Sequence, residues 1–169
     1  MRISAKQLIG SALLIGLAAS LMAQEIPRRL RGTWIVKHEI PTRTICCWGE
    51  AEAHRLIGTE IEYTADSFRW KNTITRHPTV QVVNLSAEQF HDENSGGAND
   101  SQVDFRQLGI RAPQATQITL GHEPAELTGA TTEIPGDVVL IKGPNTIVFS
   151  VCNVYFEAQR RPVLGTNRK

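Results

Sequence analysis

Patterns that mark metal, cofactor and catalytic sites are largely missing from this sequence. Its five histidines never occur at the HxH or HxxxH spacing of a metal-binding pair, and its three cysteines include no CxxC motif. There is no Gly-x-Ser-x-Gly nucleophile elbow, no glycine-rich phosphate loop and no paired set of carboxylates. The sequence therefore predicts a protein that is not an enzyme and that carries neither a metal nor a cofactor.

An excess of basic residues is missing as well. The chain has 18 lysines and arginines against 17 aspartates and glutamates, and residues 1–23 contain two of the basic residues and none of the acidic ones. Without that segment the chain is slightly acidic. Binding to nucleic acid requires a basic surface, so the charge balance predicts no nucleic-acid partner and no adhesion to anionic membranes.

Long apolar runs are absent except near the N-terminus. There, Leu8–Ala19 follows a basic start and precedes several small residues. The run is too short for a stable membrane anchor and fits the middle part of a secretory signal peptide. We expect removal of residues 1–23 by cleavage after Ala23, with cleavage after Ser20 as the alternative. The sequence thus predicts a periplasmic or secreted protein.

The cysteines are few, but an oxidising compartment would favour a disulfide between two of them. Cys46 and Cys47 are adjacent, and a bond between neighbours closes a strained ring. A long-range bond to Cys152 is therefore expected, and we favour Cys47–Cys152 over Cys46–Cys152. Such a bond closes a long loop and would stabilise the fold by about 2–4 kcal/mol.

Most of the remaining chain has the pattern of β-strands. Alternating or β-branched apolar residues predict strands at 33–39, 59–64, 67–71, 79–85, 114–120, 138–142 and 146–159. Short helical segments are predicted at 50–57 and 87–92, the second from a capping box of Ser86 and Gln89.

The organisation is that of one domain. Residues 24–161 are long enough for a single core, and residues 162–169 are predicted to form a disordered tail. The last predicted strand, 146–159, is apolar on both faces, with Phe149 and Tyr155 expected on the same face. A strand of this kind is typically buried on both sides.

A motif at the start of the first strand suggests a family. Gly32-Thr33-Trp34 is a Gly-x-Trp at the opening of an exported, mainly antiparallel β-protein, and this resembles the lipocalins and their calycin relatives. The resemblance implies a lipocalin-like antiparallel up-and-down β-barrel with one or two short helices. It also implies that Arg160 or Arg161 packs over Trp34 by a cation–π contact, with Gly32 and Arg160 in structural roles. A β-sandwich is the alternative fold.

Aromatic side chains on the predicted strands are the candidate ligand-binding residues. They are Trp34, Tyr63, Phe68, Trp70, Phe149 and Tyr155. In a barrel of this class they either line a lumen that holds a small apolar molecule or fill a narrow core, and the sequence leaves both open.

Two functions follow from these observations. The first is a non-catalytic barrel that binds a small apolar ligand through the aromatic residues. The alternative is an envelope interaction protein, such as an enzyme inhibitor or an immunity-type protein, that uses rigid loops as a prepared binding surface. The loops 41–50, 95–101 and 122–136 would then contact the partner protein.

Overall fold

The computed structural model of the 169-residue chain describes residues 24–42, 50–94, 103–122 and 133–162. The predicted signal peptide and most of the predicted disordered tail lie outside these residues, as do Cys46 and Cys47. The strands and helices are β1 (Gly32–Ile40), α1 (Glu50–His54), β2 (Glu60–Tyr63), β3 (Ser67–Trp70), β4 (Thr73–Arg76), β5 (Thr79–Ser86), α2 (Ala87–Asn94), β6 (Gln114–Gly121), β7 (Val138–Gly143), β8 (Thr146–Val151) and β9 (Val154–Arg160).

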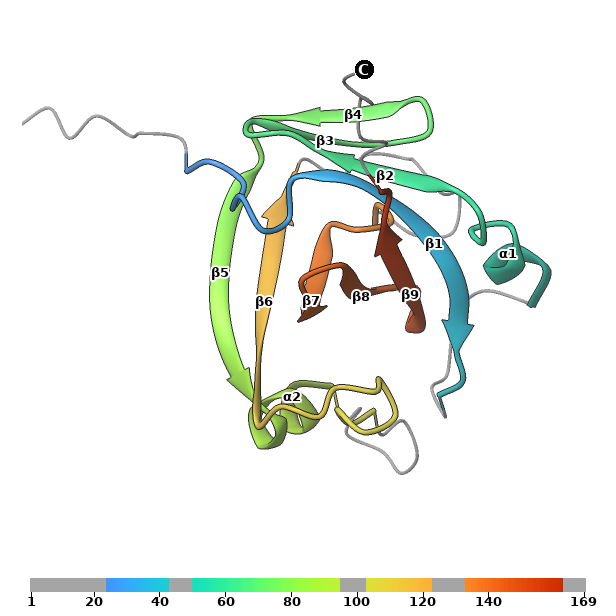
Figure 1. Ribbon diagram of the computed structural model, residues 1–169, viewed down its shortest axis with the longest axis vertical. Helices are drawn as coiled ribbons and strands as arrows, with labels where there is room; N and C mark the ends of the chain where they lie inside the picture. The colour runs from blue at the N-terminus through green and yellow to red at the C-terminus, as the bar shows by residue number, and fades with distance from the viewer. Residues whose placement is uncertain (1–23, 43–49, 95–102, 123–132, 163–169) are drawn as a thin grey trace, which may run out of the picture.

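All described strands belong to one curled antiparallel sheet (Figure 1). The strand order is β4-β3-β2-β1-β9-β8-β7-β6-β5, so consecutive strands of the chain lie side by side except β4 and β5, and β1 lies next to β9. This is the cyclic order of an up-and-down barrel with one pair missing. No ladder among the described strands joins β4 to β5, although only His77 and Pro78 separate them in the chain.

The mainly β prediction is therefore confirmed, together with the antiparallel up-and-down order and the two short helices. The expected closure is not reached among the described strands, because the sheet is a curled half-barrel with β4 and β5 as its edges. The single sheet also differs from the two packed sheets of a β-sandwich. Among the described residues, no helix is both long and apolar enough to cross a bilayer.

The curl brings distant strands together on the inner face of the sheet. Side chains of β2 and β3 meet side chains of β6, β8 and β9 there, in a cluster that contains Ile61, Tyr63, Phe68, Ile118, Phe149 and Phe156. Strands so far apart in the sheet order can touch only across the concave side. The inner face is thus the main hydrophobic core.

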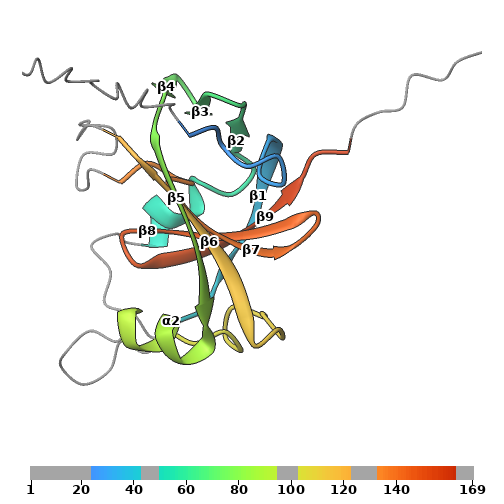
Figure 2. The same ribbon diagram turned by 90° about the vertical axis from the view of Figure 1, so that its left-hand side faces the viewer.

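The other face of the central strands is also covered. Leu140, Val148 and Tyr155 pack with Phe90 of α2 and with apolar residues of the segment 103–110. Helix α2 lies at one end of the sheet (Figure 2), and it begins with the predicted capping box. Ser86 N–H donates to Gln89 Oε1 over 2.9 Å, and Gln89 N–H donates to Ser86 Oγ over 3.1 Å. The expected burial of the C-terminal strands on both faces is confirmed, since β9 is buried at its first five positions.

One strand prediction is wrong. The predicted strand 146–159 is a hairpin of β8 and β9, with a two-residue turn at Cys152 and Asn153. Both turn residues have positive φ, 52° and 62°, which is the conformation of a tight hairpin turn. Phe149 now pairs with Phe156, and Tyr155 pairs with Ser150. Because paired residues share a face, Phe149 and Tyr155 lie on opposite faces rather than on the same one.

A closed set of contacts surrounds Trp34 where β1 meets β9. The indole is fully buried and donates from Nε1 to the Leu30 carbonyl over 2.7 Å. The Arg160 guanidinium lies 4.1 Å from the ring centroid and donates to the carbonyl oxygens of Arg29 and Arg31. Gly32 has φ of 120°, and a Cβ there would lie 2.8 Å from Arg160 Nη1. A side chain at this position would strain the backbone and would displace the Arg160 guanidinium.

A partly buried ion pair joins β7 and β9. Lys142 Nζ lies 2.6 Å from Glu157 Oε2, and the two side chains are 23% and 12% exposed. Burial raises the pKa of Glu157, but the hydrogen bond and charge of Lys142 outweigh it, with a smaller contribution from His38. The net pKa of Glu157 is below its ordinary value.

This pair predicts a pH dependence of stability. Because the pKa of Glu157 is lower in the folded state, its stabilisation is present above the unfolded pKa of about 4.3 and is lost as the pH falls through the folded pKa. We expect Glu157→Gln to be less stable than the wild type near pH 7 and to lose less stability on acidification. Urea denaturation at a series of pH values measures this. The matched control is Glu62→Gln, which removes an exposed ion pair, and equal pH slopes for wild type and Glu157→Gln would contradict the assignment.

Candidate functional site

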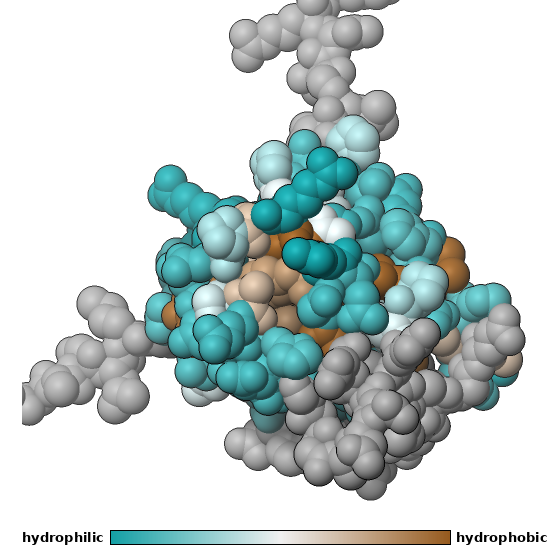
Figure 3. Space-filling view, turned by 90° about the horizontal axis from the view of Figure 1, so that it is seen from below, coloured by the Kyte–Doolittle hydropathy of each residue, from teal (hydrophilic) through white to brown (hydrophobic). Residues whose placement is uncertain are grey.

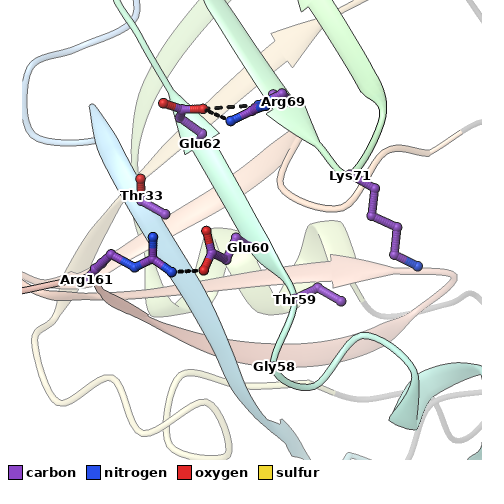
Figure 4. A pocket seen from close by; sticks show the side chains of 8 residues that line it. All are labelled: Thr33, Gly58, Thr59, Glu60, Glu62, Arg69, Lys71 and Arg161. Atoms are coloured by element: carbon purple, nitrogen blue, oxygen red, sulfur yellow. Dashed lines mark hydrogen bonds and ion pairs between the residues drawn. The ribbon is translucent and has the colours of Figure 1, made fainter.

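A polar groove of about 520 Å³ lies on the outer face of β1, β2 and β3 (Figure 4). Its lining residues are Thr33, Gly58, Thr59, Glu60, Glu62, Arg69, Lys71 and Arg161. Strand alternation explains the lining, because Ile61 and Tyr63 of β2 enter the core while Glu60 and Glu62 project outward. Arg161 comes from the chain just after β9, where its N–H donates to the Thr33 carbonyl over 2.8 Å.

The groove contains charges of both signs. Glu62 and Arg69 are cross-strand partners, and the Arg69 guanidinium forms an ion pair with the Glu62 carboxylate. Arg161 forms a second ion pair with Glu60. Lys71 makes no ion pair among the described residues, and its Nζ lies 4.4 Å from the ring centroid of Trp70. The lining therefore has one more cation than it has carboxylates.

These ion pairs are open to solvent. The side chains are 52% and 39% exposed for Arg69 and Glu62, and 52% and 44% exposed for Arg161 and Glu60. Exposed pairs of this kind are screened by water and contribute little to stability. Their charges remain available to a ligand that enters the groove, and Gly58 adds no side chain to its floor. The space above that glycine is open, since a Cβ built there meets no atom within 4 Å.

Five of the six predicted ligand-binding aromatic residues are together in the inner core. Trp34, Tyr63, Phe68, Trp70 and Phe149 belong to one cluster and are at most 7% exposed. Tyr63 donates its hydroxyl hydrogen to the Gly136 carbonyl over 2.8 Å, and its ring stacks on Phe68 with centroids 6.2 Å apart. Burial, and secondarily the charge of Asp137, raises the pKa of Tyr63 well above its ordinary value. Phe149 stacks on Phe156 with centroids 5.5 Å apart, so the rings are part of the packed core.

Tyr155, the sixth predicted residue, is on the opposite face under α2. Its hydroxyl donates to Asn94 Oδ1 over 3.0 Å, and burial raises its pKa to about 12, with a smaller effect from Glu133. A cavity of about 30 Å³ lies beside it, lined also by Phe90, Leu140, Val148, Gln117 and Ser150. That volume suits a water molecule, whereas ligand pockets usually measure about 300–1,000 Å³.

A histidine–carboxylate pair lies where β6 ends and β7 begins. His122 Nε2 is 3.2 Å from Asp137 Oδ2, and each side chain is 11% exposed. Asp137 Oδ2 also accepts the Ile134 N–H over 3.0 Å, and the His122 ring lies 6.2 Å from that of Phe68. The spacing of the histidines along the chain gave no indication of this pair. Between these two residues, the segment 123–132 is outside the described part of the chain.

The described residues contain no group of three or more histidine, cysteine, aspartate or glutamate side chains that could hold a metal. Cys152 is buried, but both candidate partners are outside the described residues, so the Cys47–Cys152 bond stays a prediction. The predicted interaction loops 41–50, 95–101 and 122–136 also lie largely outside them.

Comparison with known proteins adds no family to this description. No protein-family model matches the chain, and neither a curated protein nor a solved structure matches it at a significant level. The resemblance to the lipocalins therefore stays an interpretation of the Gly-x-Trp motif.

Proposed function

We propose that this protein is an exported, non-catalytic binding protein that recognises a polar protein partner at the groove on β1–β3. The observation that carries the proposal is the contrast between the two faces of the sheet. The inner face is filled by buried aromatic and aliphatic side chains, whereas the outer face carries an open groove of about 520 Å³. In this proposal the segment 1–23 is the export signal, and the fold is a lipocalin-like half-barrel that serves as a rigid support.

The chemistry of the groove favours a polypeptide over an apolar small molecule. Its charges of both signs can pair with complementary charges on a partner, and such complementarity sets orientation and specificity at protein interfaces. Lys71, stacked on Trp70, supplies the cation that no carboxylate of the groove neutralises. An acidic side chain of the partner would form an ion pair with Lys71.

Site-specific photo-crosslinking tests the proposal. A photoreactive residue at position 71 is expected to give one discrete adduct in the native compartment, and raising the ionic strength should reduce its yield because exposed charges are screened. The matched control replaces Glu88, which is exposed on α2 away from the groove. Charge reversal by Arg69→Glu should reduce the adduct formed from position 71. Equal adducts at positions 71 and 88, or none at position 71, would contradict a partner at the groove.

An apolar ligand is the second candidate, and one observation favours it. The end of the molecule that carries α2 shows apolar residues gathered in the middle of the face, with hydrophilic residues around them (Figure 3). A small molecule bound there would co-purify with the protein and be identified by mass spectrometry. Saturable uptake of an apolar fluorophore together with such a molecule would replace the groove proposal by this one.

A further inference from the structure

Strand β5 forms a long and unprotected edge of the sheet. It pairs with β6 through eight consecutive residues without a register shift, and no other described strand pairs with it on the side away from β6. Its sequence, TVQVVNLS, is uncharged and contains neither proline nor glycine. An edge with these properties presents free backbone N–H and C=O groups to any chain that can add a strand.

The opposite edge of the sheet is protected by the usual means. Strand β4 has four residues and ends in Arg76, and a short strand with a terminal charge is a poor template for pairing. Strand β5 has twice that length. It forms the left-hand boundary of the sheet in Figure 1, and in Figure 2, which is seen from that side, it runs in front of the other strands.

An exposed valine marks the middle of this edge. Val82 is 39% exposed, although its partner on β6, Ile118, is fully buried. Among the described residues it is one of three large apolar side chains with high exposure. It is exposed because the sheet ends there, so a further strand beyond β5 would cover it.

We propose that β5 pairs antiparallel with β5 of a second copy of this chain, around a two-fold axis near Val82. A two-fold axis perpendicular to the sheet keeps each side chain on its own face and places Val82 against the same residue of the other copy. The neighbouring pairs join Gln81 with Val83, Val80 with Asn84 and Thr79 with Leu85.

A second copy of the chain is the best partner strand for β5 because β5 carries no charge. Identical strands around a two-fold axis place like residues close together, so any charged residue near the axis would repel its copy. Strand β5 has none, and it offers β-branched residues that form favourable cross-strand pairs. A charged partner strand would find no complementary charge on β5.

The resulting dimer has one continuous sheet, and it leaves the groove open. In the strand order, β5 lies at one edge, while the groove is on β1–β3 near the other edge. Dimer formation through β5 is therefore independent of partner binding at the groove, and each can be tested without the other.

Sedimentation velocity of the purified protein over a range of concentrations tests the dimer. The wild type is expected to show a concentration-dependent monomer–dimer equilibrium. Val82→Lys places two like charges at the axis and should weaken dimerisation at least about tenfold. Ile57→Lys is the matched control, because Ile57 is also exposed, at 41%, and lies after α1 away from β5. This variant should dimerise like the wild type.

A second variant keeps the dimer testable if Val82→Lys fails to fold. Gln81→Lys changes an exposed polar residue of β5 and should weaken the dimer in the same direction, with an unchanged circular dichroism spectrum and thermal midpoint. A wild type that remains monomeric at all concentrations would overturn the proposal. So would a dimer that both lysine variants of β5 leave as tight as the wild type.

Discussion

Replacing Trp34 by alanine is expected to lower the free energy of unfolding by about 3–5 kcal/mol, the largest effect of any single substitution considered. The indole is fully buried in the inner core, and its Nε1 hydrogen bond to the Leu30 carbonyl is lost with it. The change also removes the ring beneath Arg160. The Arg160 guanidinium donates hydrogen bonds to the carbonyls of Arg29 and Arg31. Loss of the indole therefore leaves a cavity and also loosens the attachment of the segment before β1.

Urea denaturation followed by circular dichroism measures this loss. Trp34→Phe is the control for ring volume, because it keeps an aromatic ring under Arg160 and removes the Nε1 donor, and it should have a smaller effect. Arg160→Met keeps the aliphatic cover and removes the hydrogen bonds, so it should also lie between the wild type and Trp34→Ala. A loss below about 1 kcal/mol for Trp34→Ala would show that the site collapses around the missing ring and that the contacts add little.

Loss of the predicted disulfide is expected to have the next largest effect. Reduction should lower the free energy of unfolding by about 2–4 kcal/mol, because a bond from Cys47 to Cys152 restricts a long loop of the unfolded chain. Cys152 occupies the turn between β8 and β9 with a φ of 52°, and it is 4% exposed. A bond there would tie the region before α1 to the central hairpin of the sheet.

Unfolding with and without reductant measures the stabilisation, and peptide mapping of the unreduced protein identifies the pair. Cys46→Ala and Cys47→Ala are matched variants of adjacent residues. If the predicted pairing holds, only Cys47→Ala removes the bond and makes the stability insensitive to reductant. A bond that survives Cys47→Ala and disappears in Cys46→Ala assigns Cys46 instead. Equal stability of the oxidised and reduced wild type would contradict a structural disulfide.

The sequence predicts the strands best where the two faces of a strand differ. Trp34 and Val36 alternate with outward residues in β1, and Ile61 and Tyr63 do so in β2. The sequence pattern gives no turn at Cys152 and Asn153, because the chain turns there without glycine or proline and apolar residues continue on both sides. Both faces of β8 and β9 are buried, so no alternation of apolar and polar residues is present that could reveal the turn. The positive φ tolerated by asparagine is the sole local indication.

The groove was not predictable from local patterns. Glu60, Glu62 and Arg69 have the appearance of an ordinary solvated face, and they become a site through the β2–β3 register and through Arg161 from the far end of the domain. His122 and Asp137 likewise meet only through folding. The aromatic residues were predicted on strands as candidate ligand-binding residues, and they lie on strands with buried side chains. Whether they would fill the interior or line it depends on the curl of the whole sheet, which no short segment determines.

The pairing of β1 with β9 has a consequence for the order of folding. Trp34 opposes Arg160 in this ladder, so the first strand of the sheet is paired on one side by the last. During synthesis, β1 can form its ladder with β2 early, but its other edge stays open until the C-terminal strand emerges. The nascent chain therefore exposes a pairing edge and an incomplete Trp34 site throughout that interval. Rapid pairing of the C-terminal strand β9 with β1 would therefore limit aggregation more than faster formation of the β1–β3 ladders.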